Sequence, residues 1–492
     1  MTRPTPTLSK RRRRGAPPPL VNIDRRNHIP VFQQIYRSIQ QSIMSGSLPS
    51  GSRLPSSRTL SGDLDVARTT VVLAYEHLEA EGYVNGKGSA GTIVADLRLP
   101  GETPRVDRHR ENPVSNAPNY SRLQSAPVPF RIGEPAVDAF PTVLWSRLYA
   151  RRHRRSGASL LGYGDRAGYL PLRRSIAEYV GVSRRVRAVP EQIILTRGAQ
   201  QAVDLAVRVL LRPGDQVWVE DPGYLGVREV IKLAGGILVP VPVDDCGINV
   251  DAGMRMAGTA TMVCVAPSHQ FPLGRTLSLD RRLALLEWAR RSAAWVIEDD
   301  FDSEFRYAGA PIASLQGLDT ANRVIYVGTF SKTVFPALRL GYLIPPPELL
   351  GRFCAAQISI DSLSPTAEQA TLTDFIEEGH FTRHVRRMRA IYRERQEALL
   401  GAARQGLPDT LQVQAAETGM HAMGWLTRRG ANDIEVSQEA RKHGIEAQPL
   451  SRYCISAALP PGLVLGFGAL PPRELILGVR KLGDILTKRQ RS

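Results

Sequence analysis

The chain has 492 residues, of which 42% are hydrophobic and 23% charged, and its formal net charge at pH 7 is +17. This length exceeds one ordinary hydrophobic core, so we expect two or three domains, and the composition excludes a disordered protein. The basic excess favours a polyanionic partner, usually nucleic acid, although charge alone does not establish one.

Two further classes are excluded by simple patterns. No stretch approaches the roughly 20 apolar residues that a membrane span requires, and the N-terminus lacks the apolar segment of a signal peptide. The four cysteines, Cys246, Cys264, Cys354 and Cys454, form no close pair, which argues against a zinc site or a disulfide framework. We therefore predict a cytoplasmic protein without a metal site.

The first predicted segments are a tail and a small helical domain. Residues 1–20 are basic and proline-rich, cannot bury a core and are expected to be disordered. Residues 21–95 form the small domain. Apolar residues recur every four positions from Val31 to Ile43, which predicts a first helix with one apolar face.

A helix–turn–helix and a β-hairpin complete this domain. Ser56 or Ser57 is expected to cap a second helix. A third, in "ARTTVVLAYEHLEAEGYV", has apolar residues at Val71, Leu73, Ala74 and Leu78. The stretch "GYVNGKGSAGTIVA" predicts two short strands around a Gly-rich turn that contains Asn85 and Gly86. This order of elements is that of a winged helix–turn–helix.

The stretch "SGSLPSGSRLPSSRTLSGDLDVARTTVVLAYEHLEAEGYV" resembles the DNA-binding domain of GntR-type repressors over nearly its whole length. An arginine that opens a recognition helix can pair bidentately with guanine, and nearby hydroxyls and helix-end amides suit phosphate. The alternative is that these arginines form only a solvated face. The resemblance implies contacts to double-stranded DNA at Arg53, Arg58, Arg68, Thr69, Thr70, Lys87 and Gly88.

Beyond this domain the composition changes twice. Residues 96–127 are charged, rich in Pro and Asn, and lack a sustained apolar period, which predicts a linker. Over residues 128–485, β-type runs alternate with amphipathic helical stretches, the signature of an α/β domain.

Four apolar runs of this domain end in polar or Gly-rich residues, at 196–200, 220–224, 299–300 and 331–332. In open α/β sheets, ligands bind at the carboxyl ends of the strands. These residue types suit pyridoxal 5′-phosphate, whose aldehyde needs a lysine, whose ring nitrogen needs a carboxylate, and whose phosphate favours a helix N-terminus with an arginine. On spacing alone, an ordinary ion pair at Lys332 remains an alternative.

Five stretches resemble the fold-type I aminotransferases in that family's order: "GYGDRAGYLPLRRSIAEYV", "TRGAQQAVDLAVRVLLRPGDQVWVEDPGY", "APSHQFPLG", "VIEDDFDSEFRY" and "YVGTFSKTVFPALRLGY". The resemblance implies an α/β fold with a mostly parallel central sheet and a smaller C-terminal α+β subdomain. It implies that Lys332 holds the cofactor as an internal aldimine, that Asp299 binds the ring nitrogen and that Tyr224 stacks on the ring.

The same resemblance implies a phosphate site and a dimer. Tyr163 resembles the tyrosine that reaches the phosphate of the partner subunit. The implied phosphate-binding residues are Gly198, Ala199, Gln200, Ser331 and Arg339.

The chain departs from the aminotransferase pattern at three places. Phe271 and Phe301 stand where an asparagine and a tyrosine usually hydrogen-bond the cofactor's 3′-oxygen, and a phenyl ring cannot do so. The late strand "LVLGFGAL" lacks the usual carboxylate-binding arginine, for which Arg452 is the nearest candidate. His269 lies beside the site in sequence, where a structural role is the simpler interpretation.

A GntR-like DNA-binding domain followed by an aminotransferase-like domain resembles the MocR/GabR regulators. The resemblance implies a transcriptional regulator, in which an amino-acid-like or amine effector would displace Lys332 from the aldimine and shift DNA binding, and it implies a head-to-tail homodimer. The alternative is a working aminotransferase that its DNA-binding domain merely localises. The sequence does not disclose the operator, the effector or the direction of control.

Overall fold

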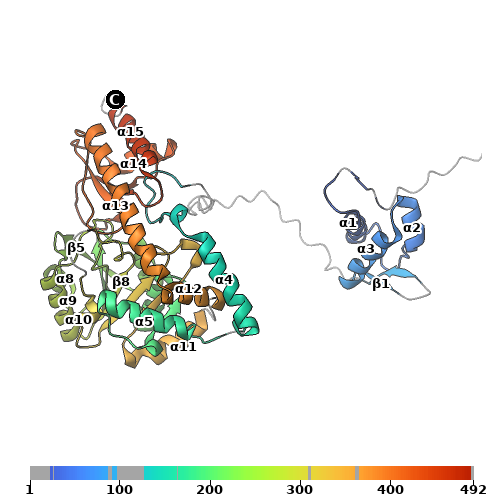
Figure 1. The fold of residues 1–492 in the computed structure, drawn as a ribbon, viewed down its shortest axis with the longest axis horizontal. Helices are drawn as coiled ribbons and strands as arrows, with labels where there is room; N and C mark the ends of the chain where they lie inside the picture. The colour runs from blue at the N-terminus through green and yellow to red at the C-terminus, as the bar shows by residue number, and fades with distance from the viewer. Residues whose placement is uncertain are drawn as a thin grey trace, which may run out of the picture. The chain divides into compact units, whose positions relative to one another are not determined.

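The computed structural model describes residues 21, 23–25, 27–86, 91–96, 127–162, 164–307, 312–360 and 365–488. The chain divides into two compact units, residues 1–120 and 121–492 (Figure 1). The predicted tail, and all of the predicted linker except its two end residues, lie outside the described residues. Among the described helices, none is long and apolar enough to cross a bilayer.

The N-terminal unit is a three-helix bundle with a two-stranded β-sheet, as the sequence predicts. Ile35, Ile39 and Ile43 of the first helix pack against Val71 and Leu78 of the third, and all five are buried. The four-residue spacing therefore marks the buried face correctly. The elements are α1 Val31–Met44, α2 Ser57–Leu64, α3 Arg68–Ala80, β1 Val84–Gly86 and β2 Thr92–Val94.

Three local details refine the predictions for this unit. Ser56 is the cap of α2, because its hydroxyl accepts the amide hydrogen of Thr59 at 3.1 Å. Of the apolar residues of α3, Leu73 is exposed, whereas Tyr75 is buried and donates its hydroxyl to the Pro55 carbonyl at 2.9 Å. Asn85 and Gly86 were also expected in a turn, but both belong to β1, opposite Ile93 and Thr92 of β2.

The C-terminal unit is built on an eight-stranded, mostly parallel sheet with the order β3-β10-β9-β8-β7-β4-β5-β6. Only β10, which pairs with β3 and β9, and the edge strand β6 run antiparallel to their neighbours. The central strands are apolar almost throughout because helices cover both faces. The strands are β3 Ile194–Thr196, β4 Gln216–Asp221, β5 Ile237–Asp244, β6 Gly247–Ile248, β7 Met262–Val265, β8 Trp295–Asp300, β9 Val324–Thr329 and β10 Gly341–Ile344.

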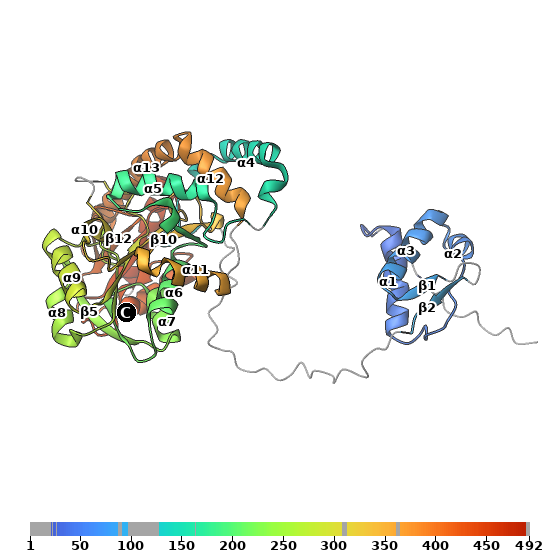
Figure 2. The same ribbon diagram turned by 90° about the horizontal axis from the view of Figure 1, so that it is seen from below.

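Helices pack on both faces of this sheet. One face is covered by α6, α7 and α11, and the other by α5 and α12 at one end and by α8 and α9 at the other (Figure 2). The helices are α4 Thr142–Ser156, α5 Leu170–Arg184, α6 Ala199–Leu210, α7 Leu225–Leu233, α8 Val250–Ala257, α9 Leu279–Arg291, α10 Leu315–Leu318, α11 Leu350–Ile360, α12 Thr366–Glu377 and α13 His380–Gly406.

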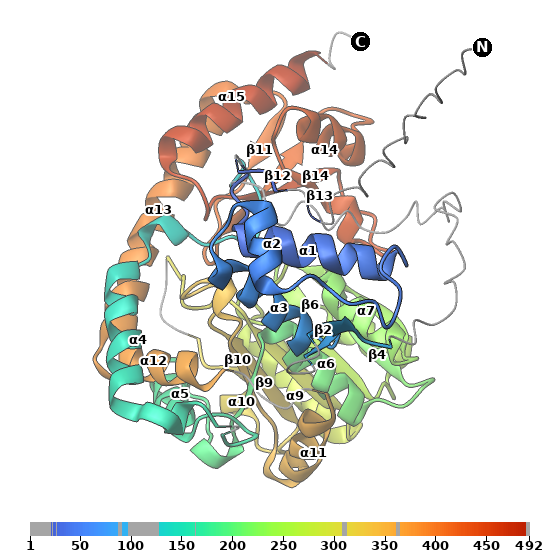
Figure 3. The same ribbon diagram turned by 90° about the vertical axis from the view of Figure 1, so that its right-hand side faces the viewer.

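The predicted smaller α+β subdomain follows α13. Its four strands pair antiparallel in the order β11-β12-β14-β13, and α13, α14 and α15 pack with them around a separate apolar core (Figure 3). Its further elements are β11 Leu411–Val413, β12 His421–Leu426, α14 Asp433–Lys442, β13 Gln448–Pro449, β14 Gly462–Gly466 and α15 Pro472–Lys488.

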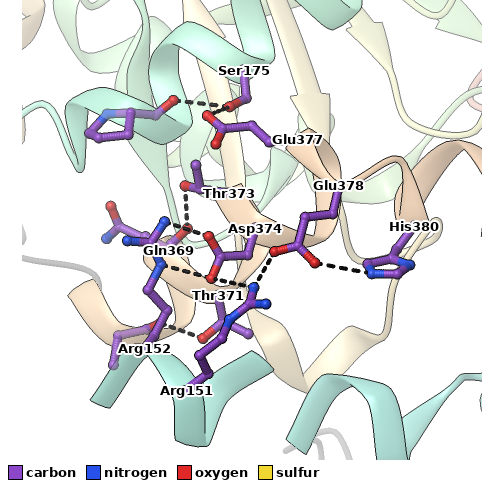
Figure 4. Close-up of polar contacts among 12 residues, drawn as sticks. Arg151, Arg152, Ser175, Gln369, Thr371, Thr373, Asp374, Glu377, Glu378 and His380 are labelled. Carbon is purple, nitrogen blue, oxygen red and sulfur yellow. Dashed lines mark hydrogen bonds and ion pairs between the residues drawn. The ribbon is translucent and has the colours of Figure 1, made fainter. Parts of the chain in front are cut away.

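Ion pairs join α4 to α12 (Figure 4). Asp374 accepts hydrogen bonds from Nε of Arg152 at 2.8 Å and from Nη2 of Arg151 at 3.2 Å. Arg151 also donates to Glu378, whose second oxygen lies 3.3 Å from Nε2 of His380. These contacts fix α4, which buries only Leu148 fully, to the body of the unit.

Candidate functional site

The N-terminal unit presents basic and hydroxyl side chains where α2 and α3 begin. Arg68 and Thr69 open α3 and are exposed, and Thr70 is half-buried. Arg68 donates from Nε to the hydroxyl of Ser57 at 3.2 Å, so the first turns of the two helices are adjacent. Arg58, the next residue of α2, is exposed as well. An exposed helix N-terminus with arginines beside it is suited to anionic ligands.

Arg53 lies at the base of the β-hairpin. Its backbone forms an antiparallel bridge with Ile93, and its guanidinium lies 2.9 Å from where a Cβ on Gly91 would stand. Residue 91 has a φ of +86°, a backbone conformation that favours glycine. Lys87 and Gly88, the other two predicted DNA contacts, lie outside the described residues.

The C-terminal unit contains a cavity of about 390 Å³ at the carboxyl ends of β4, β7, β8 and β9. Parallel strands end at the same edge of the sheet, which is why residues far apart in sequence meet there. Tyr163, the remaining residue predicted to bind the cofactor, lies outside the described residues. The predicted residues that line the cavity are Gly198, Ala199, Gln200, Tyr224, Asp299, Ser331, Lys332 and Arg339.

Lys332 follows β9, and its amine points towards Gly133. Its Nζ donates to the Gly133 carbonyl at 2.5 Å. Burial lowers the pKa of this amine, while the carboxylates of Asp302, Glu134 and Asp299 act in the opposite direction. A lowered pKa increases the neutral, nucleophilic fraction of a lysine, which is what reaction with a carbonyl compound requires.

Asp299 and Asp300 end β8 and point to opposite faces of the sheet. Asp300 has partners within the protein, because its Oδ2 accepts Nε of Arg184 at 2.7 Å and the hydroxyl of Tyr326 at 2.5 Å, although its Oδ1 is buried without a partner. Asp299 lines the cavity, and its buried Oδ1 has no hydrogen-bond partner. Burial, then the charges of Asp300 and Asp302, raise the pKa of Asp299 to about 7. This orphaned acceptor fits a cationic N–H donor such as a pyridinium.

The start of α6 forms one end of the cavity. Gly198 precedes the helix with a φ of +114°, and a Cβ on Gly341 would lie 2.7 Å from its Cα, so both glycines permit a close backbone approach. Ser331 is held nearby by its amide, which donates to Oγ1 of Thr329 at 3.2 Å. The unpaired amides of a helix N-terminus, with Ser331 and Arg339, are suited to a phosphate dianion. The Gln200 side chain is not aimed there, because it donates to the Gly226 carbonyl at 3.0 Å.

Aromatic rings form the next part of the lining. Tyr224 presents its ring at the cavity and meets Phe271 edge-on, with centroids 6.2 Å apart. Phe271 and Phe301 both line the cavity, so the two positions identified as departures from the aminotransferase pattern do face the site. Arg452 does not: its side chain is exposed and donates to Oε1 of Gln448 at 3.1 Å.

Several lining residues were not predicted. Asp302 and His421 are two of them. His269, which the sequence placed beside the site with a structural role, does not line the cavity itself: its Nδ1 lies 2.9 Å from Oδ1 of Asp302 and its ring 4.7 Å from that of His421. Asp302 follows Asp299 by three residues at a strand end, so the strand-end pattern carried a signal for it. Gly133 and Met420 were indicated neither by a strand-end pattern nor by a resemblance, although Glu134 and His421 follow them directly in the chain. Among the described residues, no group of three or more potential ligands could hold a metal ion.

These features fit pyridoxal 5′-phosphate. The cavity offers a lysine with a lowered pKa, an orphaned buried carboxylate oxygen, a helix N-terminus and an aromatic ring. Each corresponds to one functional group of that cofactor.

Comparisons with known proteins agree with both halves of the chain. Residues 32–94 match the family described as bacterial regulatory proteins, gntR family, and residues 128–462 match aminotransferase class I and II. The chain is 36% identical over 468 residues to the probable rhizopine catabolism regulatory protein MocR of Rhizobium meliloti, covering 94% of each chain. It is 33% identical to the pyridoxine biosynthesis transcriptional regulator PdxR of Corynebacterium glutamicum, covering 89% of this chain and 91% of the relative.

Solved structures resemble the C-terminal unit. A kynurenine aminotransferase of Pyrococcus horikoshii, solved in complex with PMP, aligns with a TM-score of 0.69 and 27% identity over 75% of this chain and 93% of its own. An α-aminoadipate aminotransferase of Thermus thermophilus, complexed with N-(5′-phosphopyridoxyl)-L-leucine, aligns with a TM-score of 0.69 and 28% identity over 75% and 97%. The fold of this unit is therefore that of fold-type I aminotransferases.

Proposed function

We propose that the cavity around Lys332 controls DNA binding in this chain, which belongs to the MocR-type family of GntR regulators with an aminotransferase class I and II domain. The protein is a transcriptional regulator that binds DNA through its N-terminal unit, and its cofactor is pyridoxal 5′-phosphate. The roles of individual residues, the effector and the assembly are the proposed part.

For DNA binding, we assign base contact to the start of α3. Arg68 and Thr69 are exposed there and free of the core, which α3 contacts through Val71 and Leu78. Arg58 and Arg53 would contact phosphates on either side. This division follows the general behaviour of helix–turn–helix proteins, in which phosphate contacts position the reader and base contacts specify the sequence.

For the cofactor, we assign each side chain a task that its surroundings support. The cofactor supplies an aldehyde that reacts with amines and a ring that withdraws electrons. Lys332 provides the amine, Asp299 holds a proton on the ring nitrogen and Tyr224 covers one face of the ring. The start of α6, with Ser331 and Arg339, binds the phosphate.

Control of DNA binding requires that the ligand state of the cavity favours one arrangement of the two units over another. A ligand with different affinities for two arrangements shifts their equilibrium, and thereby the affinity for DNA. We also propose a head-to-tail homodimer, in line with the aminotransferase resemblance, because two DNA-binding units suit a repeated operator. Access to the chromosome places such a regulator in the cytoplasm.

The convergence of Lys332, Asp299 and the start of α6 in one cavity carries this proposal. The test compares Lys332→Ala with Lys232→Ala, a lysine exposed on α7, after each full-length protein is incubated with the cofactor. We expect Lys332→Ala alone to lose the visible absorption band and the borohydride-trapped adduct located by mass spectrometry. Footprinting of the upstream region of the gene, with and without the cofactor, should then show a change for the Lys232 variant only.

The same protein samples distinguish the regulator from the alternative function, a working aminotransferase. Rapid conversion of the cofactor to its amine form by a panel of amines and amino acids, with DNA binding unchanged, would favour the enzyme. A trapped adduct at another lysine, or an unchanged spectrum in Lys332→Ala, would refute the assignment of Lys332.

A further inference from the structure

A buried pair of a histidine and a carboxylate adjoins the cavity and is not among the proposed cofactor contacts. His269 follows β7 and Asp302 follows β8, and these two strands are parallel neighbours, so their carboxyl ends bring the two residues together. Nδ1 of His269 lies 2.9 and 3.0 Å from the two carboxylate oxygens of Asp302, and both side chains are buried. Nδ1 therefore carries a hydrogen, since an ionised carboxylate can only accept.

The surroundings of His269 make it a support for Asp302. Its other ring nitrogen, Nε2, is buried and has no hydrogen-bond partner among the described residues, and the ring does not line the cavity. The ring packs against those of Phe301 and His421, at centroid distances of 5.6 and 4.7 Å. His421 adds no charge at physiological pH, because burial lowers its pKa to about 3. Asp302 does line the cavity, so His269 can act on the site through this carboxylate.

The turn before β12 closes over the pair. A Cβ on Gly419 would lie 2.0 Å from Cε1 of His269 and 2.6 Å from Oδ2 of Asp302, and this glycine has a φ of +82°. The Gly419 amide donates to the Phe305 carbonyl at 3.0 Å, and its carbonyl accepts from the hydroxyl of Tyr307. The pair is therefore packed against backbone that is itself held in place, which fixes the orientation of Asp302.

Asp302 acts on Lys332 more strongly than the other neighbouring carboxylates do. Burial lowers the pKa of the Lys332 amine, and the charges of Asp302, Glu134 and Asp299, in decreasing order, oppose this effect. A hydrogen bond from Nδ1 of His269 favours the ionised form of Asp302, so it maintains this charge in buried surroundings that disfavour it.

The two phenylalanines of the cavity leave charge as the remaining influence on the Lys332 nitrogen. Phe271 and Phe301 line the cavity at the positions where the aminotransferase pattern has hydrogen-bond donors to the cofactor's 3′-oxygen. A phenyl ring cannot donate such a bond. A nearby carboxylate, by contrast, favours the protonated form of a nitrogen without contacting the 3′-oxygen.

We infer that His269 is a positioning residue that holds the Asp302 carboxylate ionised beside Lys332, and that this charge favours the protonated form of the Lys332 nitrogen. An amine must be neutral to attack a carbonyl group and takes up a proton when it leaves. The pair therefore sets the pH range over which Lys332 binds and releases the cofactor. The inference rests on the proposed function, because it takes Lys332 to be the residue that holds the cofactor.

The test follows the visible band of the full-length, cofactor-loaded protein as a function of pH. Asp302→Asn removes the charge, and His269→Phe removes the Nδ1 hydrogen but keeps a ring. Both should lower the pH midpoint of the band by about one unit or more, which is a tenfold loss of proton affinity at the Lys332 nitrogen. His269→Asn places an amide N–H near the position of Nδ1 and should restore most of the wild-type midpoint.

A second readout uses the cofactor-free protein. The rate of cofactor uptake depends on the neutral fraction of Lys332, so its pH midpoint should fall in the same two variants. The control is Glu417→Gln, which neutralises an exposed carboxylate two residues before Gly419 and should move neither midpoint. If His269→Phe does not fold, Asp302→Asn carries the test, because its amide oxygen still accepts from Nδ1 of His269.

A purely structural role for the pair predicts a different result. Denaturant unfolding would then show lower stability for Asp302→Asn and His269→Phe, while both pH midpoints stayed at their wild-type values. That outcome overturns the inference, as does a His269→Asn variant whose midpoints equal those of His269→Phe. A wild-type protein without the visible band is a failure of the proposed function instead.

Discussion

The substitution Asp299→Asn should change the stability of the cofactor-free protein and its affinity for the cofactor in opposite directions. The carboxyl of Asp299 has a pKa raised from 3.8 to about 7, chiefly by burial, and its Oδ1 is buried without a hydrogen-bond partner. Holding that charge in the folded state therefore costs free energy, which a neutral amide of the same shape does not incur.

The sign and size follow from proton linkage. Above pH 3.8 the unfolded chain releases the proton of Asp299, whereas the folded chain retains it until about pH 7. The destabilisation therefore grows across this window and is constant above it. About 3 pH units at about 1.4 kcal/mol each give an upper bound of about 4 kcal/mol. Because the effective dielectric constant of a protein interior is well above that of a dry medium, the real penalty is smaller, and we expect Asp299→Asn to stabilise the cofactor-free protein by about 2 kcal/mol at pH 8 and by much less at pH 4.5.

Cofactor affinity should fall in the same variant. The wild-type carboxylate gains a charge-assisted hydrogen bond to the protonated ring nitrogen, and losing one typically costs about 1.5–3 kcal/mol. We therefore expect the Kd for pyridoxal 5′-phosphate to rise about 10- to 100-fold.

Denaturant unfolding followed by tryptophan fluorescence measures the stability of the C-terminal unit alone. All five tryptophans, Trp145, Trp218, Trp288, Trp295 and Trp425, belong to that unit. The matched control is Asp300→Asn, which leaves the buried guanidinium of Arg184 without its carboxylate and should lower stability by about 3–5 kcal/mol. The reasoning is refuted if Asp299→Asn destabilises the cofactor-free protein at pH 8, or if its cofactor affinity equals that of the wild type.

Two other substitutions test the DNA-binding unit and the contact between α4 and α12. Arg68→Ala should weaken binding to an operator fragment by about 1–3 kcal/mol, measured by fluorescence anisotropy. The control Arg37→Ala, which removes an exposed arginine of α1, should leave this binding unchanged. Equal affinities of the two variants would rule out base contact by the start of α3. Asp374→Asn removes the negative charge that Arg151 and Arg152 share and replaces one acceptor oxygen by a donor NH2, and should lower the free energy of unfolding by about 1.5–3 kcal/mol. Its control is Asp204→Asn, which breaks a more exposed pair with Arg208 and should cost less than about 1 kcal/mol in the same denaturant experiment.

Local patterns predicted the helices of the N-terminal unit because their determinants lie within a few residues. The four-residue spacing of Ile35, Ile39 and Ile43 marks one helix face, and the Ser56 cap needs only Thr59. Leu73 is exposed although it is apolar, because spacing alone does not decide which of two neighbouring residues faces inward. That choice went to Tyr75, whose hydroxyl has a partner at Pro55, outside the helix.

The positions of the cavity residues were predictable in part. Parallel strands end at one edge, so the polar residues after β4, β8 and β9 had to gather there. Asp299 and Asp300 are consecutive in β8, so their side chains point to opposite faces of the sheet. Their different roles become clear only once the partners of Asp300 are known. Arg184, which pairs with Asp300, lies 116 residues away in the chain, and no local pattern connects the two.

The sequence by itself determined which side chains this protein can use: an amine at Lys332, a carboxylate at Asp299 and arginines at the start of a helix. Only the tertiary structure decided their states. The Gly133 carbonyl lies 199 residues from Lys332 in the chain and still receives its hydrogen bond. Burial and neighbouring charges set a pKa, and both are properties of the packed surroundings rather than of the local sequence.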